Sequence, residues 1–118
     1  MRDYWFSGLD DEVAQVYFKR TGVAAIVFPA TMICAPLIGE DVEVAIQGNK
    51  IRFDIAIARN ISPGSTAGIP GLVLPAGVTR AGLPVGIEFD SPAGSDHPML
   101  ALGLSLQQCL GPIPPPAV

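Results

Sequence analysis

Glycine and proline are concentrated in one stretch of this chain, and their positions limit the structures that it can adopt. Residues 60–98 contain seven Gly and six Pro, which favour turns and interrupt regular elements. The same stretch includes the largely apolar runs Leu72–Leu74 and Val85–Phe89, whose burial requires a core. A flexible linker lacks such runs. We therefore predict ordered loops that connect short strands.

Two strands are predicted within this stretch, Gly71–Pro75 and Leu83–Asp90, joined by a turn at residues 80–82. Successive side chains of a strand point to opposite faces, so Glu88 and Asp90 share one face. Like charges on one face raise each other's pKa. The alternation with apolar residues nevertheless predicts a simpler arrangement, in which both carboxylates face solvent.

A helix followed by a buried strand is predicted at the start of the chain. Residues 1–22 combine helical spacing of apolar residues with acids early and bases late, and Gly22 is a suitable C-terminal cap. The next run, Ala24–Phe28, is uncharged and β-branched, which is typical of a strand covered on both faces. This combination indicates α/β architecture.

The segment between residues 42 and 59 allows two interpretations. Val42–Ile46 and Ile51–Ile57 are predicted to form a hairpin, with Gly48 and Asn49 at positive φ in the turn. Alternatively, Asp54 begins a short helix that runs to residue 59. The spacing of the apolar residues does not decide between them.

A leucine-rich helix is predicted near the end of the chain. Ser95 or Asp96 should cap it, and it should run through Cys109 and end at Gly111. Its apolar residues lie nearly all round the helix, so both sides need cover that a small domain seldom supplies. Residues 112–118 are expected to form an extended, proline-rich tail.

Composition excludes several classes of protein. With 118 residues and 12.3 kDa, the chain forms one small domain at most, and roughly two thirds of its surface can be buried in a compact fold. A hydrophobic fraction of 49% and a mean hydropathy of +0.43 are too apolar for intrinsic disorder. A net charge of −4 and seven scattered cations argue against nucleic-acid binding.

The uncharged stretch Gly22–Gly39 is shorter than a membrane span, and Pro29 and Pro36 would break a helix there, so no membrane association is expected. The acidic N-terminal residues are not typical of a signal peptide, so none is expected. Cys34 and Cys109 match no metal-ligand or disulfide pattern and are expected to be free thiols. We therefore expect a cytoplasmic protein without a metal.

No complete catalytic set is evident from the residues alone. A serine triad needs a nucleophile, a base and an orienting carboxylate. His97 is the single histidine, and its pairing with Asp96 at a helix start is better explained by capping. Gly64–Gly68 superficially resembles a nucleophile elbow, but Thr66 stands at its centre instead of serine, and Ser65 is displaced. We predict a Gly-rich turn there.

Several longer motifs resemble the C-terminal part of the amidase-signature family. Arg59–Gly77 (RNISPGSTAGIPGLVLPAG), Gly82–Asp90 (GLPVGIEFD) and Ala93–Asp96 occur in that family's order, before a leucine-rich helix. Phe28–Thr31 (FPAT) and Ala35–Asp41 (APLIGED) are most similar to its indoleacetamide and mandelamide hydrolase branch. The resemblance covers nearly the whole chain, but only the tail of the family's chain.

The resemblance implies an α/β fold with a central mixed sheet and flanking helices, of which residues 1–118 are the C-terminal segment. Family members hydrolyse amides with a serine, a bridging serine in a cis peptide and a lysine. This sequence lacks the Gly/Ser-rich run that holds those serines, and neither Lys19 nor Lys50 has a matching context. The implied function is that of an amidase fragment for a small carboxamide, inactive alone and without cofactor.

The resemblance also assigns four residues to the lining of a substrate pocket: Thr31, Met32, Ile33 and Asn60. Loop packing, and an Asn that fixes a turn, are the alternatives at these positions. The alternative function is a noncatalytic amidase-like binding or assembly module. Its leucine-rich helix would pack against a second copy or a separate catalytic half.

Overall fold

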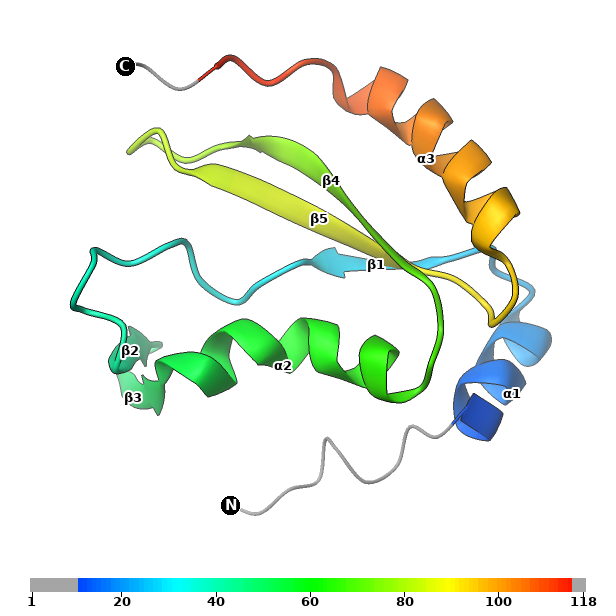
Figure 1. Cartoon of the computed structure of the whole chain (residues 1–118), viewed down its shortest axis with the longest axis horizontal. Coiled ribbons are helices and arrows are strands. Elements are labelled where there is room, and N and C mark those ends of the chain that lie inside the picture. The colour runs from blue at the N-terminus through cyan, green and yellow to red at the C-terminus, as the bar shows by residue number, and fades with distance from the viewer. Residues whose placement is uncertain (1–10, 116–118) are drawn as a thin grey trace.

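Three strands form the central antiparallel sheet, in the order β1–β5–β4 (Figure 1). The structure is a computed structural model, and it describes residues 11–115. β5 (Pro84–Asp90) lies in the middle, between β1 (Ile26–Pro29) and β4 (Gly71–Val78). The α/β class and the flanking helices are confirmed, and the strand pairings described are antiparallel.

The β4–β5 hairpin confirms the two strands and the turn predicted for the Gly/Pro-rich stretch. The Thr79 N–H donates to the Leu83 carbonyl at 2.8 Å, and Gly82 takes a φ of +80° in the turn. β4 continues beyond the predicted Pro75 and has a bulge before Gly77. In β1, Val27 is 53% exposed, so the expected burial of this strand on both faces is wrong for the chain described here.

A second, two-stranded sheet is followed directly by a helix, so each interpretation of this segment is partly confirmed. β2 (Glu43–Ile46) pairs with β3 (Asn49–Arg52), and α2 (Phe53–Thr66) begins at the next residue. The positive φ values fall at Gln47 and Gly48, one position earlier than predicted. The hairpin turn is thus the two residues that separate the paired Ile46 and Asn49.

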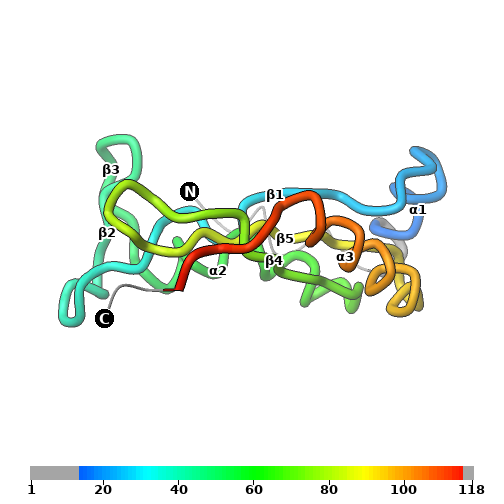
Figure 2. Tube along the Cα trace, turned by 90° about the horizontal axis from the view of Figure 1, so that it is seen from above, coloured from blue at the N-terminus to red at the C-terminus, as the bar shows by residue number. Residues whose placement is uncertain are grey.

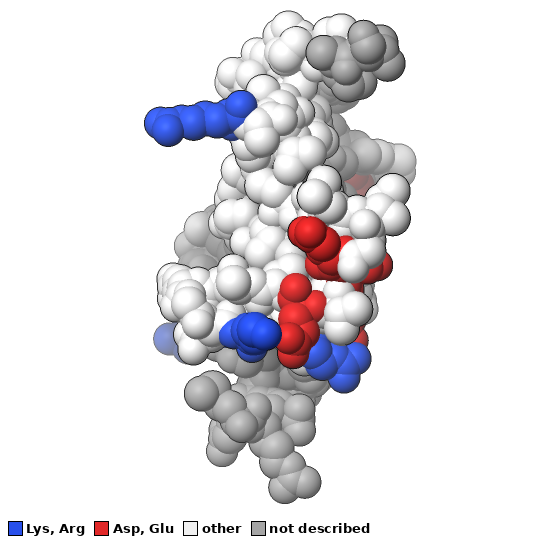
Figure 3. All heavy atoms as spheres, turned by 90° about the vertical axis from the view of Figure 1, so that its left-hand side faces the viewer, with Lys and Arg blue, Asp and Glu red and all other residues white. Residues whose placement is uncertain are grey.

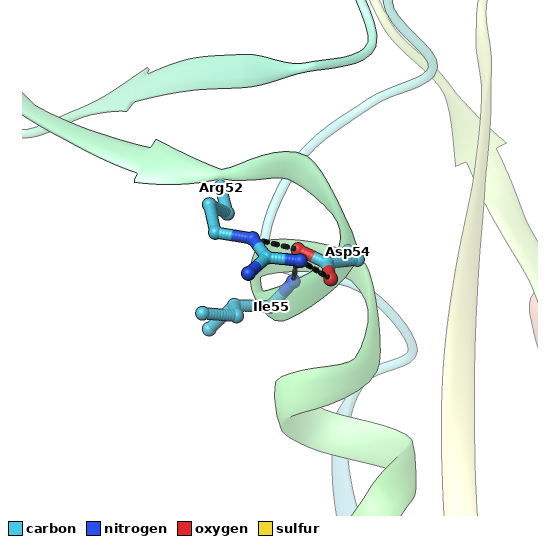
Figure 4. Close-up of polar contacts among 3 residues, drawn as sticks. All are labelled: Arg52, Asp54 and Ile55. Atoms are coloured by element: carbon cyan, nitrogen blue, oxygen red, sulfur yellow. Dashed lines mark hydrogen bonds and ion pairs between the residues drawn. The ribbon is translucent and has the colours of Figure 1, made fainter. Parts of the chain in front are cut away.

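An exposed cluster stabilises the start of α2 (Figure 4). The Arg52 guanidinium donates to both carboxylate oxygens of Asp54, at 3.1 and 2.5 Å, and the Ile55 N–H donates to Asp54 Oδ1 at 2.9 Å. The hydrogen bonds from Arg52 lower the pKa of the Asp54 carboxyl. One amide that lacks an intrahelical partner is thereby satisfied.

The predicted Gly-rich turn at Gly64–Gly68 is wrong in its first half, because α2 extends through Thr66. Pro63 lies inside the helix, and the turn is formed only by Ala67 and Gly68, which has a φ of +63°. Packing explains the difference, because Gly64 is buried against Asp90 of β5. Tertiary contact therefore overrides the local preference of Pro and Gly.

α1 (Asp11–Thr21) ends at Gly22 as predicted, where the Gly22 N–H donates to the Phe18 carbonyl at 2.9 Å. Residues 1–10 of the predicted helix lie outside the described residues. Ala14 and Phe18 are buried, whereas Val16 and Tyr17 remain about half exposed. The inward face of α1 is therefore narrow.

α3 (Asp96–Leu110) begins after Ser95 and ends before Gly111, as predicted. The predicted capping by a side chain is wrong, since Ser95 makes no capping hydrogen bond and its Oγ donates to the Pro92 carbonyl. Met99 and Gly103 form its buried side, and a Cβ at Gly103 would overlap Leu72 of β4. The other side is uncovered, with Leu100 and Leu104 exposed by 55% and 66%. The described part of the tail, residues 112–115, has no regular secondary structure.

The elements form a thin layer rather than a rounded body. α2 and α3 lie on opposite sides of the central sheet (Figure 1), and the edge view is narrow (Figure 2), with overall extents of 41 × 40 × 19 Å. The surface area is 8706 Å², against about 6,100 Å² expected for a compact chain of this mass. Much apolar surface therefore remains open.

Charged side chains occupy limited parts of this surface. Figure 3 shows one narrow side, on which red and blue side chains gather mainly over the β2–β3 hairpin and the loop before it, and the rest is largely white. The buried apolar side chains of the described residues are small in number: Ala14, Phe18, Ala56, Ala67, Leu74, Phe89 and Met99. None of the described helices has the length and apolar composition to cross a bilayer.

Candidate functional site

A cavity of about 270 Å³ lies between the loop after β1 and the start of β5. It contains three of the four residues predicted to line a pocket. Its lining residues are Thr31, Met32, Ile33, Cys34, Ala35, Pro84, Val85 and Gly86. None of these side chains is charged and most are apolar, although polar atoms form a substantial part of the exposed lining, so the cavity suits an uncharged group.

Backbone contacts position this loop against the sheet. The Ala30 N–H donates to the Gly86 carbonyl at 3.1 Å, which holds the loop beside β5 just beyond the last residue of β1. Within the loop, Thr31 Oγ1 donates to the Ile33 carbonyl at 2.7 Å. A Cβ at Gly86 would lie 3.0 Å from Val73 Cγ1, so glycine permits the close approach of these strands.

The fourth predicted residue, Asn60, lies on α2 and does not line the cavity. Its Nδ2 donates to the Pro29 carbonyl at 2.7 Å. Pro29 is the last residue of β1, so this hydrogen bond fixes the point at which the loop begins. In this chain Asn60 is therefore placed to hold the start of the loop.

The residues that line the cavity include no pair of acidic and basic side chains. Ser65 and Thr66 lie in the last turn of α2, and His97 lies in the first turn of α3; all three are exposed. Within residues 11–115, no hydrogen bond joins any of these side chains to an acidic or basic side chain. The described residues also include no cluster of three potential metal ligands.

Glu88 and Asp90 form a second polar feature, and the prediction that they face solvent is wrong. They are 7% and 3% exposed. Both carboxylates lie beside Gly71, where a Cβ would be 2.9 Å from Asp90 Oδ1 and 3.2 Å from Glu88 Oε1. The face that they share is covered because α2 continues through Gly64, and Gly64 lies directly against the Asp90 carboxylate.

The buried environment changes the acidity of both groups. Burial raises the pKa of the Asp90 carboxyl to about 6. Burial and the neighbouring Asp90 charge raise the pKa of Glu88. Glu88 Oε2, Asp90 Oδ1 and the adjacent Ser91 Oγ have no hydrogen-bond partner among the described residues. The sequence signal for this burial is the pair of glycines at positions 64 and 71, which leave room for carboxylates.

These features define an α/β protein with a small cavity lined by uncharged side chains. The family model described as Amidase matches residues 7–100. An indoleacetamide hydrolase of Agrobacterium vitis is 43% identical over 94 residues, which are 80% of this chain and 20% of that protein. A mandelamide hydrolase of Pseudomonas putida is 35% identical over 104 residues, which are 84% of this chain and 18% of that protein.

The fold comparison agrees with the sequence comparison. A crystal structure of an amidase superposes with a TM-score of 0.74 at 30% sequence identity, covering 86% of this chain and 23% of the other. The chain belongs to the amidase family. It spans about 20% of the length of the indoleacetamide hydrolases that it matches. The predicted resemblance to the family is confirmed over residues 7–100.

Proposed function

We propose that this chain forms one wall of the substrate pocket of an amide hydrolase, as the C-terminal segment of the amidase domain. The observation that carries the proposal is the cavity beside Thr31, Met32 and Ile33, in a chain that matches the amidase family over residues 7–100. Asn60 supports this wall through its hydrogen bond to Pro29.

The proposed substrate class is a small carboxamide with an apolar group. Support comes from the mostly apolar lining of the cavity and from the names of the relatives, which denote hydrolases of indoleacetamide and mandelamide. The amidase sequence outside these 118 residues supplies the serine, the bridging serine and the lysine. Attack by the serine releases ammonia and leaves an acyl-enzyme, which water hydrolyses to the acid.

A chimera tests this proposal directly. The matching segment of the Agrobacterium vitis indoleacetamide hydrolase is replaced by residues 7–100 of this chain, and release of ammonia from indole-3-acetamide is measured. The chimera is expected to hydrolyse the amide, whereas the 118-residue chain alone is expected to show no turnover. A chimera that folds, judged by circular dichroism, but has no activity contradicts the proposal.

The role of the cavity requires a separate variant. In the active chimera, Met32→Ala should raise KM roughly tenfold, because an apolar contact with the substrate is lost. Leu37→Ala is the matched control, since Leu37 is exposed and lies outside the cavity lining. Equal KM values for the two variants would show that the loop does not contact the substrate.

A noncatalytic assembly module is the second candidate function, and the uncovered leucine side of α3 favours it. Such a module forms a defined oligomer or pairs with a separate catalytic half through this side. Sedimentation equilibrium of the purified chain distinguishes the two functions. A discrete dimer that persists on dilution supports the module. A monomer that is active only when it is joined to the rest of an amidase, as in the chimera, supports the first proposal.

A further inference from the structure

A second cavity, of about 260 Å³, lies near the end of β5 that is opposite to the loop cavity. Elements α1, β1 and α2 and the segment after α2 enclose it. Its lining residues are Ala14, Tyr17, Ile26, Pro63, Gly64, Ala67, Ile69 and Asp90. Among these residues only Asp90 carries a charge, so one acidic residue borders an otherwise largely apolar space.

One oxygen of this carboxylate lacks a hydrogen-bond partner within residues 11–115. Asp90 is 3% exposed, and its Oδ1 accepts no hydrogen bond from the described residues. Glu88, which lies on the same face beside Gly71, leaves its Oε2 unpartnered as well. A buried ionised group without a partner is costly, and a nearby opposite charge removes much of that cost.

Two basic side chains that form ion pairs are engaged elsewhere. Lys50 pairs with Glu43, at 3.6 Å, and Arg52 pairs with Asp54. Both pairs belong to the β2–β3 hairpin and the start of α2, whereas Asp90 lies against the far end of that helix. Neither ion pair involves Asp90 or Glu88, and within residues 11–115 Asp90 Oδ1 and Glu88 Oε2 accept no hydrogen bond, so both oxygens can accept one from a cation that enters from outside.

The cavity walls restrict the kind of cation. A hard metal ion requires several oxygen ligands, whereas Pro63, Ala67 and Ile69 offer an apolar surface. Tyr17 adds an aromatic ring, which attracts an ammonium group when the group lies over its face. At about 30 Å³ for each water-sized group, the volume holds roughly nine non-hydrogen atoms.

We propose that this cavity is a binding site for a small organic ammonium ion, whose N–H groups bind Asp90 and whose apolar body packs on Pro63, Ala67 and Ile69. Glu88 supplies a second negative charge behind Asp90. The site lies apart from the loop cavity and needs no catalytic residue. It is therefore independent of the proposed amide hydrolysis.

An NMR titration of the 118-residue chain at pH 7.5 tests the site with two probes. 2-Phenylethylamine has nine non-hydrogen atoms and is protonated, and 2-phenylethanol has the same size without charge. The amine is expected to bind saturably and at least tenfold more tightly than the alcohol. Equal binding of the two probes, or no saturable binding of the amine, overturns the proposal.

Variants locate the binding. Asp90→Asn should weaken amine binding by tenfold or more, because a charge-assisted hydrogen bond is lost. Glu43→Gln is the matched control, since it neutralises an exposed carboxylate on β2 and should leave binding unchanged. Amine binding that survives Asp90→Asn, or that Glu43→Gln weakens equally, overturns the site.

The unmodified chain provides a test that does not depend on the folding of a variant. Amine binding should weaken at least threefold between pH 7.5 and pH 5, as Asp90 becomes protonated, while the alcohol should show no such change. Circular dichroism at both pH values verifies that the chain remains folded. A pH-independent affinity for the amine contradicts a role for the buried carboxylate.

Discussion

Asn60 of α2 and Pro29 of β1 are joined by a hydrogen bond of 2.7 Å, although they lie 31 positions apart in the chain. The bond connects the helix to the last residue of an edge strand. Asn60→Ala should therefore lower the free energy of unfolding by about 1 kcal/mol, the typical net contribution of one hydrogen bond. Urea unfolding measures this change.

Asn60→Asp is the informative companion, because aspartate keeps the size of the side chain but cannot donate when ionised. It should destabilise the chain at least as much as Asn60→Ala at neutral pH. Gln108→Ala, at an exposed position of α3, is the control and should have little effect. A stability of Asn60→Asp equal to that of the wild type would exclude donation from this side chain.

The buried Asp90 carboxyl should make stability depend on pH. Its pKa of about 6 in the folded chain lies above the ordinary value of 3.8, so between these two values the folded state binds more protons than the unfolded state. Stability should therefore be higher near pH 4.5 and should fall as pH rises through 6. The loss is at most about 3 kcal/mol.

Urea unfolding at pH 4.5, 6 and 7.5 measures this dependence. In Asp90→Asn, the decrease in the free energy of unfolding between pH 4.5 and pH 7.5 should be smaller, because asparagine does not titrate. The remaining decrease is expected to come from Glu88, whose pKa is also raised. An unchanged profile in Asp90→Asn would assign the pH dependence to other groups.

Packing of α3 on the sheet depends on Gly103 and Leu72, because a Cβ at Gly103 would overlap the end of the Leu72 side chain. Alanine in a helix is ordinarily more stable than glycine by roughly 1 kcal/mol. We expect Gly103→Ala to lose this advantage with Leu72 present and to recover it in Leu72→Ala.

A double-mutant cycle of these two substitutions should therefore give a coupling of roughly 0.5–3 kcal/mol, the range for residues in contact. Thermal or urea unfolding of the four proteins supplies the values. Additive effects of the two substitutions would show that α3 and β4 do not approach as closely as described.

The uncovered side of α3 should govern association in solution. Leu104→Glu places a charge on an exposed leucine and should reduce oligomer formation or aggregation of the purified chain, measured by sedimentation velocity. Gln108→Glu adds the same charge to the same helix at a polar position and is the control. A similar decrease in both variants would indicate a general charge effect rather than an apolar interface.

Local patterns were sufficient to predict most strands and helix ends. Gly82 and Gly111 take the positive φ values that their turn and cap require, at +80° and +76°, and both were predictable from residue type. The length of α2 was not predictable in this way. Pro63 and Gly64 are typical of a turn, and only the contact between Gly64 and Asp90 explains a helix there.

The candidate sites depended on different information. Spacing in the sequence does not predict that the loop at residues 31–35 lies next to Pro84–Gly86, because sheet pairing creates that contact. The prediction of Thr31, Met32 and Ile33 therefore depends on the resemblance to amidases. For Glu88 and Asp90, the local pattern predicts exposure to solvent, whereas both side chains are buried. Their alternation with Ile87 and Phe89 is evident from the sequence, but the cover over their face comes from α2, whose last turns are not predictable from local pattern.

The two outer strands of the central sheet each contain a proline, Pro29 in β1 and Pro75 in β4. Proline has no N–H group to offer an incoming strand, and the bulge after Pro75 distorts the ladder further. Each outer edge therefore lacks one N–H donor at its proline, which weakens the repeated strand pairing of amyloid growth. In a chain with this much open apolar surface, these prolines therefore act against uncontrolled extension of the sheet.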